Sequence, residues 1–262
     1  MKLVAAARLR KAQDRVLEAR PYAEKMRELM ASIAEAGSMP EHPLLAQRPI
    51  KKYGVILVSA DRGLCGSFNT NLLRKCQEFI RESAAQGSVL AVGKKGNQFF
   101  SRRNVPIVFN LNLPTSGPTK KHAEEVLGAA QEMFVSGEVD AIYLVYSKFY
   151  SAIRQTPEVV QLLPIEPPKS EGKSTQKDYS YEPGATELLC ALLPRYALTL
   201  ILQALLESTA SEHGSRMTAM TSATDNAGEM ISTLTLQANR SRQTTITTEI
   251  LEVVGGAEAL KG

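Results

Sequence analysis

The chain has 262 residues, a length that permits one or two domains, and its formal net charge is only +4. Hydrophobic residues make up 44% of it but aromatic residues only 6%, so much of the apolar content is Ala, Leu and Val. No dense run of Lys and Arg indicates nucleic acid binding, no run of about eighteen apolar residues indicates a direct membrane span, and the three cysteines form no metal motif.

The first segment, residues 1–36, is predicted to form one helix. Its apolar residues recur at alternating steps of three and four, which is the spacing of a coiled-coil seam. The seam consists of Ala5, Leu9, Ala12, Val16, Ala19, Ala23, Met26, Met30 and Ile33. A seam of this length needs a partner to cover it.

Residues 50–165 change to the pattern of an α/β domain. Strands are expected at Tyr53–Ala60, Ser88–Val92, Val105–Phe109 and Asp140–Tyr146, with an edge strand at Val159–Leu163. Helices are expected at Asn69–Ala85, Lys95–Arg103 and Lys121–Ser136. Strands that alternate with helices predict an open, largely parallel, Rossmann-like sheet.

The first strand ends in a Gly-rich turn, DRGLCG, whose Asp61, Arg62, Gly63 and Gly66 are the strongest candidates for chemistry in this domain. A turn of this kind can present backbone amides to a phosphate. It matches neither GxGxxG nor GxxxxGK[ST], and glycines that serve a tight turn and close packing are the favoured alternative. The three histidines are far apart in the sequence and suggest no triad. We therefore predict no catalytic residue, no cofactor and no metal.

A second long helix is predicted over residues 186–262, after a polar linker at 166–185 that is rich in Pro, Lys and Ser. No cluster of turn residues interrupts Thr186–Val254, although Gly214 adds a penalty of about 1 kcal/mol relative to Ala. At about 1.5 Å per residue, roughly sixty of these residues would span about 90 Å. A helix longer than any domain of this chain indicates a shaft.

The second helix carries its own apolar seam, and the two seams most simply cover each other. Its members are Met217, Met220, Ala227, Ile231, Leu234 and Ala238. We therefore predict an antiparallel coiled coil in which residues 1–33 lie along this seam, and the shorter first helix leaves Ile246–Val254 bare. An ordinary amphipathic face on a helical bundle is the alternative that periodicity leaves open.

Several blocks resemble the γ subunit of rotary ATP synthases, in that family's order. Residues 1–13 resemble its first helix, DRGLCGSFN at 61–69 its central turn, and residues 211–231 and 246–259 its C-terminal helix. The last block fits the family signature at Ile246, Thr247, Glu249, Glu252, Gly256 and Ala257. The family usually has further residues before the position of Met1, so we expect the chain to begin inside the first helix.

The resemblance implies a non-catalytic rotor subunit in the central stalk of a bacterial, proton-translocating ATP synthase. The coiled coil would turn inside a hexamer of α and β subunits and couple ATP synthesis or hydrolysis to rotation of the membrane c-ring, with the central domain beside the ε subunit. Its location would be peripheral, on the cytoplasmic side of the plasma membrane. Contacts with the hexamer are expected from Arg8, Arg10, Arg242, Gln243, Ile246, Glu249, Ile250 and Glu252.

Two other classes fit parts of the pattern. A coiled-coil scaffold of another assembly would share the shaft but not the family blocks. An α/β enzyme that uses the turn at residues 61–67 would need a ligand that stabilises the isolated chain, and a thermal shift with nucleotides or phosphosugars would reveal it.

Overall fold

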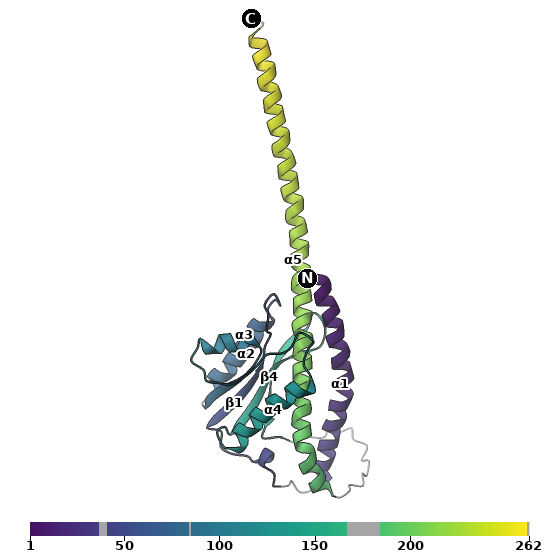
Figure 1. The fold of residues 1–262 in the computed structure, drawn as a ribbon, viewed down its shortest axis with the longest axis vertical. Helices are drawn as coiled ribbons and strands as arrows, with labels where there is room; N and C mark the ends of the chain where they lie inside the picture. The colour runs from purple at the N-terminus through teal and green to yellow at the C-terminus, as the bar shows by residue number, and fades with distance from the viewer. Residues whose placement is uncertain (37–40, 84, 167–183, 261) are drawn as a thin grey trace.

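The structure is a computed structural model that describes residues 1–36, 41–83, 85–166, 184–260 and 262. Two long helices, α1 (Lys2–Ala36) and α5 (Ala185–Ala259), lie side by side with a sheet against them (Figure 1). They run in opposite directions, as predicted, and the C-terminal part of α5 extends alone beyond the N-terminus. Most of the predicted linker, at 167–183, lies outside the described residues.

The central sheet has five strands in the order β3-β2-β1-β4-β5. Its strands are β1 (Lys52–Val58), β2 (Gln86–Val92), β3 (Ile107–Leu111), β4 (Ala141–Phe149) and β5 (Gln155–Leu163). The first four are parallel, and β5 pairs antiparallel with β4 at the edge. The shorter helices are α2 (Phe68–Glu82), α3 (Lys94–Ser101) and α4 (Lys120–Val135), and a 3-10 turn covers Pro43–Leu45. Each predicted strand and helix is confirmed, with its ends shifted by a few residues.

Both faces of the sheet are buried. Along β1, Val55 and Leu57 face α2 and α3, whereas Ile56 and Val58 face α4 and the long helices. Burial on both faces explains why the strand is an almost continuous apolar run. The second face also contains Met30 of α1, so the long helices share one core with the sheet.

The seam predicted on α1 is confirmed. Each of its members is buried except Ala19, which is half-buried. Leu9 and Val16 pack in one cluster with Leu206 and Ala210 of α5. The three-and-four spacing therefore marks the face that α1 turns toward α5.

The seam predicted on α5 is wrong for most of its length: Met217 packs against the cluster that contains Leu9 and Val16, but the members from Ala227 onward are exposed. The buried apolar residues of α5 lie within Leu189–Ala210, while Ile231 and Leu234 are 65% and 55% exposed. The reason is geometric. α5 starts beside the C-terminal end of α1, so it outruns the 35 residues of α1 after about the same number of its own and is exposed from Ser222 onward.

By length and composition alone, Thr186–Ala259 passes as a membrane-crossing helix. A core helix that packs within its own chain passes the same test. In this helix, 44% of the most apolar 18-residue stretch is buried inside the protein. The packing of Leu189–Ala210 within the protein accounts for the apolar character of this stretch.

Replacing Leu205, which is fully buried, by Ala is expected to lower the free energy of unfolding by about 2–5 kcal/mol, because the substitution leaves a cavity between α5 and the sheet. The matched control is Leu234→Ala on the exposed part of the same helix, expected to change it by about 0.5 kcal/mol or less. Chemical denaturation measures both. Equal losses would contradict the division of α5 into a packed and a projecting half.

Candidate functional site

The carboxyl ends of β1 and β4 are covered by α5. In an open α/β sheet, ligands usually bind at these ends where the strand order reverses, and the order β3-β2-β1-β4 puts that point between β1 and β4. Here Ser208 Oγ donates to the carbonyl oxygen of Val58 at 3.1 Å, and Ser211 Oγ donates to that of Ser147 at 3.0 Å. The usual ligand crevice is thus filled by a helix of the same chain.

Beside these serines, a buried carboxylate joins α1, α5 and the end of β4. The Glu207 side chain is 2% exposed and accepts hydrogen bonds from the Phe149 N–H at 3.2 Å and the Gln203 amide at 3.0 Å. Arg20 of α1 lies 4.0 Å from the same carboxylate and donates to the Phe149 carbonyl oxygen at 2.8 Å. Because a buried charge is tolerated only when it is paired and hydrogen-bonded, these contacts fix the three elements to one another.

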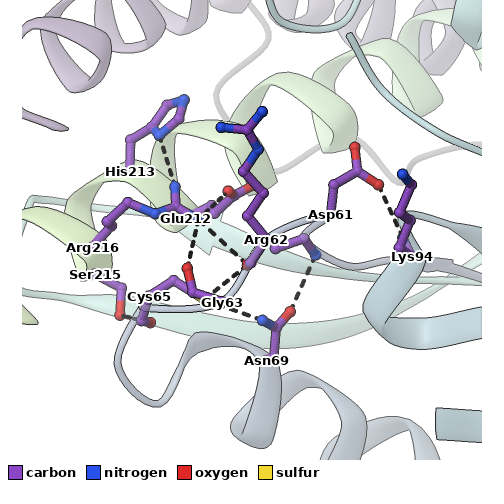
Figure 2. Close-up of polar contacts among 11 residues, drawn as sticks. Asp61, Arg62, Gly63, Cys65, Asn69, Lys94, Glu212, His213, Ser215 and Arg216 are labelled. Atoms are coloured by element: carbon purple, nitrogen blue, oxygen red, sulfur yellow. Dashed lines mark hydrogen bonds and ion pairs between the residues drawn. The ribbon is translucent and has the colours of Figure 1, made fainter. Parts of the chain in front are cut away.

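The Gly-rich turn that begins at Asp61 packs against α5 (Figure 2). Ser215 Oγ donates to the Cys65 carbonyl oxygen at 2.6 Å. At Gly66, φ is +55° and a Cβ would lie 3.0 Å from Ser215 Oγ, so both the backbone conformation and the close approach favour glycine. The structure thus supports the alternative in which this glycine serves tight packing.

Arg216 holds the same turn from α5. Its Nη2 donates to the carbonyl oxygens of Arg62 and Gly63 at 3.5 and 3.4 Å and pairs with Glu212 at 2.6 Å. Burial raises the pKa of the Glu212 carboxyl, and Arg216 opposes that shift. Burial also lowers the pKa of His213 to about 4, so this imidazole is neutral near pH 7.

Two further groups of the turn are engaged within the chain. Asp61 Oδ1 accepts from the Lys94 N–H at 2.9 Å and so stabilises the N-terminus of α3. Cys65 Sγ accepts from the Asn69 amide at 3.1 Å, and burial raises the pKa of this thiol. A protonated, buried thiol is a poor nucleophile.

Gly214 lets α5 approach the connection between β4 and β5. A Cβ at this position would lie 3.2 Å from the Ala152 carbonyl oxygen and 3.3 Å from the Ala152 Cα. Glycine at position 214 lowers helix stability, but the absence of a Cβ allows the helix to contact this backbone closely.

The predicted site residues fall into two separate groups. The turn and residues 212–216 of α5 come together beside Arg8, whereas Arg10 is exposed on α1. The remaining candidates all lie exposed on the projecting part of α5: Arg242, Gln243, Ile246, Glu249, Ile250 and Glu252. Among the described residues, no group of His, Cys, Asp or Glu could hold a metal ion.

Sequence reasoning missed the polar residues that dock α5 on the sheet. Glu207, Ser208, Ser211 and Ser215 interrupt an apolar helix at steps that keep them on its packed side. Buried polar side chains need hydrogen-bond partners, so this pattern was a signal that the helix lies over exposed backbone groups.

The sequence matches the ATP synthase family over residues 1–260. It is 50% identical to the ATP synthase gamma chain of Brevibacillus brevis, over 99% of this chain and 91% of the relative. It is also 48% identical to the gamma chain of Moorella thermoacetica, over 100% of this chain and 92% of the relative. The chain belongs to the ATP synthase gamma-chain family. As a gamma chain, it is the rotor subunit of the central stalk and a non-catalytic part of the bacterial F1 sector.

Solved structures agree on the fold of this gamma chain. A chain from the central stalk and c-ring of the Tetrahymena thermophila mitochondrial ATP synthase is 22% identical, with a TM-score of 0.62 over 86% of this chain and 97% of that one. A chain of the Euglena gracilis mitochondrial enzyme is 19% identical, with a TM-score of 0.60 over 97% of this chain and 95% of that one. Membership of the gamma-chain family excludes the two alternatives, a coiled-coil scaffold of another assembly and an α/β enzyme. The distant structures support only the fold.

Ser211→Ala is expected to lower the free energy of unfolding by about 1–3 kcal/mol, because it deprives the buried Ser147 carbonyl oxygen of the Ser211 hydroxyl. The control is Ser232→Ala on the exposed part of α5, expected to change it by about 0.5 kcal/mol or less. Urea unfolding of the two variants measures the difference. If Ser211→Ala proved as neutral as the control, the hydroxyl would not be docking α5.

Proposed function

We propose that the gamma chain works as one rigid body, in which the central α/β part carries torque to the projecting part of α5. The observation that carries this proposal is the projection itself. From Ser222 to Ala259, about 57 Å of helix at 1.5 Å per residue is exposed to solvent. Large apolar side chains lie along it: Met230, Ile231, Leu234, Leu236, Ile246, Ile250, Leu251, Val253 and Val254. An exposed apolar surface of this extent is typical of a part that a partner encloses.

The partner of the projection is, in this proposal, the hexamer of α and β subunits. Ile246 and Ile250 are one helical turn apart and would turn against its apolar sleeve. Arg242 and Gln243 match the family's Arg-Gln pair, and a guanidinium can hold a carboxylate through two hydrogen bonds and exchange it as the shaft turns. Glu249 and Glu252, and on α1 Arg8 and Arg10, would add contacts with the same subunits.

Torque needs an attachment that resists twisting. Between Glu207 and Ser215, polar side chains on the packed side of α5 bond it to the ends of β1 and β4 and to the Asp61–Gly66 turn. Bonds from one helix face to three separate segments oppose rotation of the helix relative to the sheet. We therefore assign the central turn residues Asp61, Arg62, Gly63 and Gly66 to this attachment and not to ligand binding.

The proposed division of labour follows the chain. Residues 1–36 and 186–262 form the shaft, residues 50–165 form the central domain, and 166–185 link the two. The central domain would lie beside the ε subunit and the c-ring, peripheral to the cytoplasmic face of the bacterial plasma membrane. The c-ring supplies the rotation, and the chain needs neither a cofactor nor a membrane span of its own.

The test of this function is rotation of the central domain. A bead is attached through Arg102→Cys in a Cys190→Ser background, which leaves only the buried Cys65 and Cys76 besides the label. With the α and β subunits fixed to a surface, ATP is expected to turn the bead, with one pause for each β subunit. A complex that hydrolyses ATP while its bead stands still would contradict the proposal.

Replacing Arg242 and Gln243 together by Ala is expected to leave the chain folded, because both side chains are exposed. The loss of a charge-assisted contact costs about 1.5–3 kcal/mol, so turnover of the reconstituted complex should fall by roughly tenfold to a hundredfold. The control replaces Thr233 and Thr235, also exposed on the projection, by Ala. Unchanged ATPase activity at normal subunit occupancy would show the pair to be dispensable.

A further inference from the structure

A small basic hollow lies where α1, α5 and the connection between β3 and α4 meet. Its volume is about 40 Å³. We call it the α1 notch, and it is lined by Arg8, Lys11, Ala12, Arg15, Thr115, Ser116, Gly117, Pro118, Leu206, Thr209 and His213. The proposed function assigns Arg8 to a contact with the hexamer but assigns no role to the hollow itself.

The charged side chains that line the α1 notch are all basic. Arg8, Lys11 and Arg15 follow one another at steps of three and four and so share one face of α1. Within the described chain, none of the three lies within 4.0 Å of a carboxylate oxygen, and the lining contains no acidic residue. Arg8 helps to lower the pKa of the Glu212 carboxyl, but this carboxylate is already paired with Arg216 at 2.6 Å. A concave surface with one sign of charge concentrates counter-ions.

Arg15 fixes the loop side of the notch in place. Arg15 Nη1 donates to the Ser116 carbonyl oxygen at 2.8 Å and thereby holds the connecting loop against α1. At Gly117, φ is +96°, a backbone conformation that favours glycine, and a Cβ would lie 2.7 Å from the mobile end of the Arg15 side chain. Thr115 and Ser116 also line the hollow, whereas Thr209 Oγ1 already donates to the Leu205 carbonyl oxygen at 2.7 Å.

His213 supplies a donor without adding charge. Its Nδ1 lies 3.1 Å from Arg216 Nη1, and because a guanidinium can only donate, Nδ1 must accept (Figure 2). In the neutral ring the hydrogen is therefore on Nε2. The imidazole of this lining residue is held as a neutral N–H donor.

We propose that the α1 notch binds one small tetrahedral oxyanion, with inorganic phosphate as the representative ligand. A water molecule needs about 10–15 Å³ of the space open to the centre of a water-sized sphere. The 40 Å³ of the notch therefore accommodates a group the size of about three waters, which is smaller than a nucleoside. Guanidinium and ammonium groups with hydroxyl donors are the side chains that hold such oxyanions. The inference concerns the isolated chain and does not depend on rotation.

The test is a titration of the isolated full chain with potassium phosphate at constant ionic strength, followed by the backbone amide NMR shifts of Ser116 and Gly117. Saturable shifts are expected for the unaltered chain. Arg8→Gln should weaken binding at least fivefold, whereas Arg10→Gln, which removes the same charge from an exposed position on the same helix, should change it less than twofold. Lys11→Gln, at an exposed lining position, repeats the test if Arg8→Gln unfolds.

Parallel titrations with ADP and with an Asp- and Glu-rich peptide identify the source of the anion. Binding of ADP no tighter than that of phosphate supports a site for a small ion. Tenfold tighter binding of ADP or of the peptide at the same amides would overturn the assignment in favour of a nucleotide or a protein partner. Equal weakening by Arg8→Gln and Arg10→Gln, or an absence of saturation, would also overturn it, because only diffuse charge attraction would then remain.

Discussion

The attachment of α5 to the ends of β1 and β4 is the constraint on which the rest of the molecule depends. The hydroxyl groups of Ser208 and Ser211 and the carboxylate of Glu207 satisfy backbone groups that an α/β enzyme would leave open for a ligand. The same bonds hold the long helix at a fixed position and angle on the sheet. One set of polar contacts therefore fills the usual ligand crevice and also anchors the long helix to the central domain.

The two halves of α5 have opposite surroundings although they form one helix. Its first half is covered by α1 on one side and by the sheet on another, so its burial is almost continuous. The second half has apolar side chains of the same kind, but none of the described residues of the chain covers them. A helix that continues from a fixed first half needs no new nucleation, which favours persistence of the projection before a partner encloses it.

Sequence reasoning succeeded where a pattern has one structural meaning. The α1 seam and the alternation of strands and helices between residues 50 and 165 were predicted, because periodicity reports which face of an element is apolar. Periodicity does not report what covers that face, and for this reason the whole seam at Met217–Ala238 was paired with α1, although only its start packs there and the rest projects. The docking of the Asp61–Gly66 turn on Ser215 joins segments 150 residues apart, and no local pattern encodes such a contact. The contacts of Arg242 and Gln243 stay predictions, since their partners lie in another chain.

The most direct test of a shaft with a packed and an enclosed half is hydrogen exchange of α5, in the isolated chain and in a complex with α and β subunits. In the isolated chain, amides of Leu189–Ser215 should exchange slowly and those of Ser222–Ala259 much faster, because only the first half is packed. In the complex, the second half should become protected while the first half stays unchanged. Fast exchange of Ser222–Ala259 in a fully assembled, active complex would contradict the account.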